Sequence, residues 1–221
     1  FNEQEEFIPL HAPYFGGNEK KYVMDTIEST FVSSVGAYVT NFEEMMKQIT
    51  GAKFAIAMVN GTTALHLAML VAGVKHGDAV ITQPLTFAAT ANAIVHAGAS
   101  PVFIDVDKDT LGLSPVALEE WLKANTSVNE HGCFIQSTGQ RIAACIPMHS
   151  FGFPLYIEEI IMVCDKYRIP VVEDAAESLG SYVGEKHTGT FGLLGTFSFN
   201  GNKTVTSGGG GAIITNDERI G

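Results

Sequence analysis

Residues 142–174, IAACIPMHSFGFPLYIEEIIMVCDKYRIPVVED, form the stretch that decides the fold. An apolar run at 142–146 precedes a segment with helical periodicity at 155–167, and a second apolar run follows at 169–172. Two short apolar runs separated by a helix predict a β-α-β unit with two parallel, buried strands. Two acids, Glu173 and Asp174, come directly after the second strand.

The same alternation continues on both sides of this unit. Asn41 is the expected N-cap of one helix and Gly51 its expected end, while Pro115 suits the first position of another helix. Residues 125–140 are polar and turn-rich, which indicates a surface loop or a hairpin. We predict helices at 18–29, 41–49, 62–72, 87–97 and 114–123, and further strands at 54–59, 79–81, 101–104, 180–184, 195–199 and 212–215.

This order of elements predicts an α/β fold, a three-layer α/β/α domain with a mostly parallel central sheet. The chain has 221 residues, of which 46% are hydrophobic and 17% charged. These values suit one large folded domain, residues 1–221.

Charge and cysteine content exclude several classes of protein. The net charge of −11 argues against a general nucleic-acid binder, because phosphate contacts need clustered Lys and Arg, although a few local donors can hold a phosphorylated small molecule. We expect no membrane partner, because no apolar run has the length of a span and no signal peptide opens the chain. Cys133, Cys145 and Cys164 lack the close pairing of a zinc site. They indicate reduced thiols in a cytoplasmic protein, and no metal is expected.

A lysine and an acid stand where chemistry is expected, because ligands of such sheets bind beyond the carboxyl ends of the strands. Asp174 ends one strand, and Lys203 follows another in the loop SFNGNK before a run of glycines at 208–211. A lysine amine forms a Schiff base with pyridoxal phosphate, and an aspartate keeps the pyridine nitrogen protonated. Alternation lets only one of Glu173 and Asp174 face the pocket. Taken alone, Lys203 fits a solvated surface lysine better, and Asp174 fits a cap or a salt bridge equally well.

Three further features lie at strand ends. Gly61 permits a tight turn, and the N–H groups of Thr62 and Thr63 at a helix start favour an anion, although an ordinary capped turn is the commoner explanation. Phe87 could lie flat on a heteroaromatic ring or belong to the core. His149 could line the same cleft, but a hydrogen-bonded structural histidine is the more frequent case.

Six motifs in order resemble the DegT-type sugar aminotransferases, which are pyridoxal phosphate enzymes of fold type I. The resemblance runs from about Pro9 to Asn216, and the last motif is most similar to the LegC-like branch, which acts on UDP-linked 4-keto-6-deoxy sugars in legionaminic acid or bacillosamine pathways. The motifs are NGTTAL at 60–65, GDAVITQP at 77–84, TFAATAN at 86–92, GASPVFID at 98–105, VEDAAE at 172–177 and SFNGNK at 198–203.

The resemblance implies a role for each matching position. Lys203 would form the Schiff base and then carry the proton between cofactor and substrate, and Asp174 would pair with the pyridine nitrogen. Glu177 falls where many members carry Gln against the phenolic oxygen of the ring, and a carboxylate donates a hydrogen bond only when protonated. The other residues implied to hold the cofactor are Gly61, Thr62 and Ser198 at the phosphate and Phe87 on the ring.

The resemblance also implies partners. Glutamate would donate an amino group to the keto carbon of a nucleotide-linked sugar in two half-reactions. A smaller C-terminal domain, which these 221 residues do not contain, and a second subunit would complete the active site, so a homodimer with shared sites is expected.

Three alternatives remain open at this stage. A non-catalytic ligand sensor or scaffold would keep the phosphate turn and tolerate loss of Lys203. A sugar dehydratase that uses pyridoxamine phosphate is a second alternative, but the resemblance implies histidine in place of the lysine there. A nicotinamide oxidoreductase is disfavoured, because the glycines at 208–211 precede a strand and do not open a helix.

Overall fold

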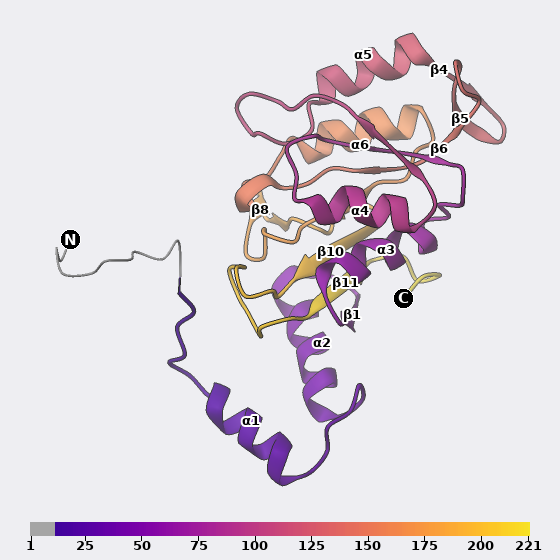
Figure 1. Ribbon diagram of the computed structural model, residues 1–221. Coiled ribbons are helices and arrows are strands. Elements are labelled where there is room, and N and C mark those ends of the chain that lie inside the picture. Colours follow the sequence, from indigo (N-terminus) through magenta and orange to yellow (C-terminus); the bar gives the residue numbers. More distant parts are fainter. Residues whose placement is uncertain (1–11) are drawn as a thin grey trace.

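The computed structural model describes residues 12–221, so the start of the family resemblance near Pro9 lies outside the described residues (Figure 1). The helices are α1 Glu19–Glu28, α2 Ala37–Thr50, α3 Gly61–Val71, α4 Ala88–His96, α5 Pro115–Asn125 and α6 Ile157–Lys166, with a 3-10 turn η1 at Ser150–Gly152. The strands are β1 Phe54–Met58, β2 Ala79–Thr82, β3 Ser100–Phe103, β4 Thr126–Asn129, β5 Gly132–Ile135, β6 Arg141–Ile146, β7 Val172–Asp174, β8 Tyr182–Val183, β9 Lys186–His187, β10 Leu194–Ser198 and β11 Gly211–Thr215.

The strands pair in the orders β3-β2-β6-β5-β4 and β1-β11-β10-β7, and parallel bridges from Cys145 to Val171 and from Met148 to Asp174 connect β6 with β7. The ladders β2–β3, β2–β6 and β7–β10 are parallel. Those of β11 with β1 and β10, and of β5 with β4 and β6, are antiparallel. The sheet is therefore mixed, and the predicted mostly parallel character is not confirmed. The physical reason is that residues 125–140 form a hairpin and β11 returns beside β10, and short connections such as a hairpin join antiparallel strands.

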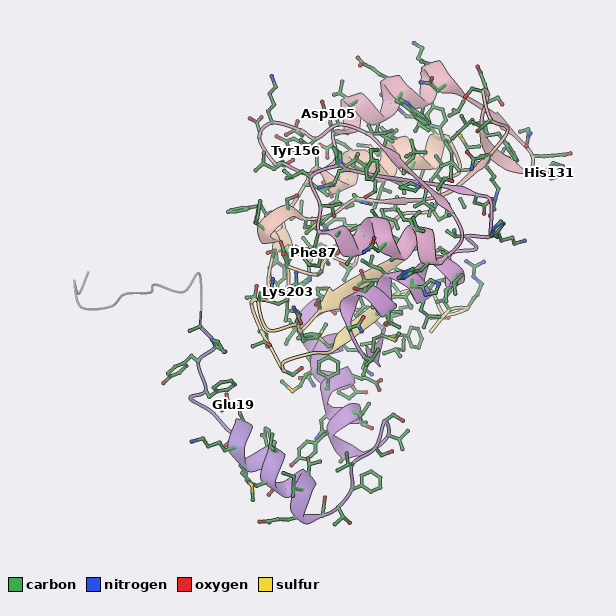
Figure 2. The ribbon with its side chains drawn as sticks, in the orientation of Figure 1. Glu19, Phe87, Asp105, His131, Tyr156 and Lys203 are labelled. Atoms are coloured by element: carbon green, nitrogen blue, oxygen red, sulfur yellow. The ribbon has the colours of Figure 1, made fainter. Side chains whose placement is uncertain are left out.

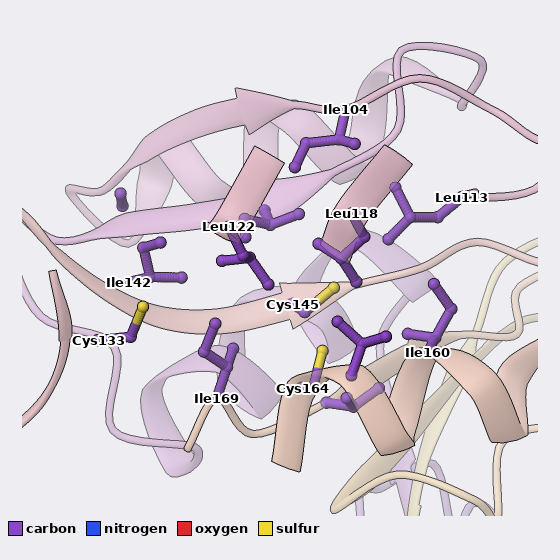
Figure 3. Packing of buried hydrophobic residues seen from close by; sticks show 14 of the residues in the cluster. Ile104, Leu113, Leu118, Leu122, Cys133, Ile142, Cys145, Ile160, Cys164 and Ile169 are labelled. Atoms are coloured by element: carbon purple, nitrogen blue, oxygen red, sulfur yellow. The ribbon is translucent and has the colours of Figure 1, made fainter. Parts of the chain in front are cut away.

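Helices cover both faces of the sheet. On one face, Leu118 and Leu122 of α5 and Ile160 of α6 pack on strand residues such as Ile142 and Cys145 (Figure 3). On the other face, α3 and α4 pack on residues that alternate with these along the strands, including Val80, Ala144 and Val172. Alternating residues of one strand point to opposite faces, so a strand covered on both sides is apolar throughout. This arrangement gives the three layers that the sequence predicts.

The predicted elements occur in the predicted order, with several shifted ends. Helix α2 begins at Ala37 after Gly36, so the prediction that Asn41 caps it is wrong, whereas Gly51 ends it in the left-handed conformation as expected. Strand β7 begins at Val172, later than the predicted 169–172, and Pro170 lacks the N–H that a ladder needs. The predicted strand at 180–184 is the first arm of the short hairpin β8–β9.

Two sequence expectations concern the environment of the protein. Cys133, Cys145 and Cys164 are free, as predicted, and the structure buries all three, while the cytoplasmic location stays a prediction. Across residues 12–221, each helix is too short or too polar to span a bilayer.

Candidate active site

One cavity of about 310 Å³ gathers most of the residues that the sequence singles out. It lies where β7 and β10 end and where α3 and α4 begin, the edge at which ligands of such sheets bind. Figure 2 shows Phe87 and Lys203 together on this side of the molecule. The lining residues are Asn60, Gly61, Thr62, Leu65, Phe87, Ala89, Met148, Asp174, Ala176, Ser198, Asn200, Asn202 and Lys203.

The start of α3 forms one wall of the cavity. Asn60 caps the helix, and its Oδ1 accepts hydrogen bonds from Thr63 N at 2.8 Å and Thr63 Oγ1 at 2.9 Å. The sequence prediction that the Thr63 N–H is open to an anion is therefore wrong, since Asn60 uses it. A Cβ at Gly61 would lie 2.7 Å from Cβ of Ser198, so only glycine lets the helix start pack this closely against the end of β10. The first N–H groups of a helix lack partners within it, and Gly61 and Thr62, which carry two of them, line the cavity together with Ser198.

Of the two adjacent acids, Asp174 lines the cavity and Glu173 does not. Asp174 is 2% exposed, and its oxygens accept hydrogen bonds from Thr90 Oγ1 at 2.8 Å and Ala176 N at 3.2 Å. Burial raises the pKa of Asp174 above its ordinary 3.8, and the Thr90 hydroxyl, the Ala176 N–H and the charges of Lys203 and His149 oppose this rise. A cation in the cavity would compensate the cost of keeping this carboxylate ionised.

Lys203 reaches the cavity from the loop after β10. Its side chain is only 7% exposed, so the surface-lysine interpretation is wrong. Its Nζ lies 2.9 Å from Glu177 Oε1 and 5.5 Å from the centre of the Phe87 ring. Glu177 therefore contacts the site by its ion pair with Lys203, although it does not line the cavity itself.

Sequence reasoning missed the residue that holds Asp174. Thr90 lies in the first turn and a half of α4, and Thr86 Oγ1 lies 2.7 Å from its hydroxyl. Thr86 precedes the helix, whose N-cap is Phe87, so helical spacing does not relate the two hydroxyls and gave no signal for this contact. The cavity residues Met148, Asn200 and Asn202 likewise carried no sequence signal.

His149 has the structural role that the sequence favours. Its ring is fully buried, and Nε2 lies 3.0 Å from Glu173 Oε2, on the face of β7 away from the cavity. Across the described residues 12–221, no three His, Cys, Asp or Glu side chains gather as metal ligands would.

The donor set around the cavity fits pyridoxal phosphate. It combines the largely buried amine of Lys203 with the buried carboxyl of Asp174 and the ring of Phe87. The start of α3 adds backbone N–H groups, and two hydroxyls lie nearby, those of Thr62 and Ser198. The close approach at Gly61, where a Cβ would fill the space beside Ser198, provides a site for an anionic group against the backbone. These residues would hold the cofactor.

Comparison with known proteins agrees with this chemistry. Residues 13–221 match the DegT/DnrJ/EryC1/StrS aminotransferase family. The chain belongs to this family. The LegC-like branch within it stays a prediction.

Individual relatives match the sequence of this chain over about half of their own lengths. EpsN of Bacillus subtilis (strain 168) is 42% identical over 96% of this chain and 52% of EpsN. GDP-perosamine synthase of Escherichia coli O157:H7 is 37% identical over 97% of this chain and 55% of the enzyme. The chain therefore spans about half the length of the curated relatives it matches.

Solved structures of family proteins share the fold. An aminotransferase from Psychrobacter cryohalolentis superposes with a TM-score of 0.82 at 30% identity, over 95% of this chain and 50% of that one. The E. coli GDP-4-keto-6-deoxy-D-mannose-3-dehydratase, solved with bound hydrated PLP, gives 0.81 at 27% identity, over 96% and 52%. These likenesses agree with the predicted fold type I architecture and with pyridoxal phosphate as the cofactor of the family.

Proposed function

We propose that this chain is the cofactor-binding part of a pyridoxal phosphate-dependent aminotransferase that acts on a nucleotide-linked keto sugar. The observation that supports the proposal best is that Lys203 and Asp174, 29 positions apart in sequence, line one cavity with Phe87 and the start of α3. When bound, the cofactor supplies an electron-withdrawing ring that stabilises negative charge on the carbon beside the amine nitrogen.

Each residue of the chain has one task in this proposal. Lys203 would hold the cofactor covalently through its amine, with the carbonyl oxygen leaving as water, and once released its Nζ would carry a proton. Asp174 keeps a ring nitrogen protonated through charge pairing. Phe87 supports the ring face, and the N–H groups and hydroxyls of Gly61, Thr62 and Ser198 bind the phosphate.

The finer parts of the proposal concern partners. Glutamate donates the amino group in one half-reaction, and the keto carbon of a UDP-linked 4-keto-6-deoxy sugar or a similar nucleotide sugar receives it in the other. The named relatives that handle GDP-linked sugars support a nucleotide sugar in general. A homodimer with shared sites is part of this proposal. So is the mostly parallel central sheet, which the parallel ladders β2–β3, β2–β6 and β7–β10 and the parallel bridges between β6 and β7 support.

The test has two stages. The chain is mixed with pyridoxal phosphate, reduced with borohydride and digested, and peptide mass spectrometry locates the attached cofactor. We expect attachment at Lys203 in the wild type and in the control Lys166→Ala, whose lysine is exposed and paired with Glu119, and none in Lys203→Ala. The longest natural form of the protein is then incubated with glutamate and a panel of nucleotide keto sugars, and 2-oxoglutarate is measured.

Two outcomes would support other functions. Specific cofactor attachment without 2-oxoglutarate from any sugar would favour a ligand sensor. Loss of a sugar hydroxyl without transfer of nitrogen would favour the dehydratase, the activity named for one structural neighbour. Lys203 argues against that outcome, because the dehydratases are expected to carry histidine at this place.

A further inference from the structure

Glu177 is joined to Lys203 by an ion pair that is largely withdrawn from water. One carboxylate oxygen lies 2.9 Å from Lys203 Nζ, and the two side chains are 23% and 7% exposed. A second pair of the same residue types, Glu119 and Lys166, lies between α5 and α6 at 2.7 Å, with side chains 47% and 59% exposed. An exposed pair is screened by solvent, whereas a withdrawn pair acts more strongly on the charge state of its members.

The Glu177 carboxylate is held in place from several directions. Its other oxygen accepts a hydrogen bond from Phe151 N at 3.0 Å. Its backbone oxygen accepts one from Thr204 Oγ1 at 3.5 Å, the residue after the lysine. A Cβ at Gly152 would lie 2.7 Å from the same backbone oxygen, so the turn at Ser150–Gly152 packs directly on Glu177. The carboxylate is therefore fixed between this turn and the lysine loop.

Three other groups lie around Lys203. The buried carboxyl of Asp174 interacts with it electrostatically, the Phe87 ring lies beside its ammonium group, and Glu19 lines a neighbouring cavity with it. Burial disfavours an ammonium ion, whereas carboxylates at short range favour it. Only the neutral amine has the lone pair that adds to a carbonyl carbon.

We propose that Glu177 is a positioning residue that engages the Lys203 amine in a largely buried ion pair and so restrains its reaction with carbonyl compounds. The inference rests on the proposed function in that Lys203 is the reactive group there. The restraint itself requires only the ion pair, whichever carbonyl compound arrives. Through this restraint, Glu177 affects how readily Lys203 reacts with the cofactor.

Reductive methylation with formaldehyde and cyanoborohydride measures this restraint without the cofactor. The amine adds to the formaldehyde carbon, water leaves, and hydride from cyanoborohydride reduces the C=N bond. The rate at Lys203 is followed by peptide mass spectrometry at neutral pH. Glu177→Gln keeps an oxygen to accept from Phe151 N but removes the charge, and we expect methylation at Lys203 to be about tenfold faster. Glu177→Ser should give the same acceleration, whereas Glu177→Asp keeps the charge and the slow rate.

The exposed pair is the matched control. Glu119→Gln should change methylation of Lys166 by less than about twofold, because solvent already screens that pair. Equal rates at Lys203 in wild type and Glu177→Gln would overturn the proposal, and so would equal acceleration in Glu177→Gln and Glu177→Asp, which would indicate lost packing. If rates change as expected but borohydride fixes no pyridoxal phosphate on Lys203, the proposed function fails and the restraint stands.

Discussion

The two sides of β7 carry adjacent acids with opposite surroundings. On one side, Glu173 is fully buried, and its two oxygens accept from His149 Nε2 and from three backbone N–H groups at 2.6–2.7 Å. A carboxylate offers about four acceptor positions, so those of Glu173 are filled by the protein. The three N–H groups belong to Gly189, Phe191 and Gly192.

On the other side, Asp174 faces the cavity with acceptor positions to spare. Within residues 12–221 it accepts from Thr90 Oγ1 and Ala176 N. The difference between the acids teaches that burial alone does not distinguish a structural carboxylate from a ligand-binding one. The number of donors that the protein itself supplies makes that distinction, and four substitutions or conditions test it.

The largest effect is expected for Glu173→Ala. The substitution leaves a buried histidine and three backbone N–H groups, which are buried or partly buried, without their acceptor, and we expect the free energy of unfolding to fall by about 3–5 kcal/mol. Urea denaturation followed by circular dichroism measures it. The exposed Glu159→Gln on α6 should change stability by less than about 0.5 kcal/mol. A loss below about 1 kcal/mol in Glu173→Ala would show that the filled acceptors matter little.

Asp174→Asn should act most strongly on ligand binding. Removing the charge that partners a ring cation should weaken binding of pyridoxal phosphate by roughly a hundredfold. A titration followed by cofactor absorbance gives the dissociation constant, and the exposed Asp165→Asn serves as control. Unchanged affinity in Asp174→Asn would contradict the assignment of Asp174 as the ligand-binding acid.

The hydroxyl that holds Asp174 has a smaller expected effect. Thr90→Val keeps the shape of the side chain but removes the donor to Asp174 Oδ2, and the pKa of Asp174 should rise further. We expect about tenfold weaker binding of pyridoxal phosphate, equivalent to the loss of one hydrogen bond to a charged group. Thr138→Val, on an exposed loop, should leave the affinity as it is. A change in stability without a change in affinity would show that Thr90 contributes to the stability of the fold and not to cofactor binding.

The smallest effect is a dependence of stability on pH. Because burial raises the pKa of Asp174 above 3.8, the folded state binds its proton more tightly than the unfolded state does. The free energy of unfolding therefore decreases as pH rises from the unfolded pKa through the folded one, and the loss is complete above the latter. Asp174→Asn lacks this loss, so its stability relative to wild type should increase over that window. Urea denaturation at several pH values from about pH 4 upward tests this, and a constant difference would contradict it.

Much of the fold and site follows from local patterns. The β-α-β unit at 142–174 and the helix predicted at 62–72 are, within one or two residues for the helix, where periodicity indicates. The site residues Gly61, Asp174 and Lys203 share one cavity because strand ends meet at one edge of a sheet. The antiparallel hairpin at 125–140 was one of two open interpretations, since a polar segment pairs only if a neighbouring strand offers an edge.

The sequence by itself determined the order of the elements and the kind of chemistry, because periodicity, glycines and a lysine–acid pair are local properties of the chain. Only the tertiary structure decided which of Glu173 and Asp174 opens to the cavity, that Thr90 holds Asp174, and that Glu177 faces Lys203. These contacts join residues 26 to 84 positions apart. Their geometry depends on how strands register and helices pack, which no local pattern specifies.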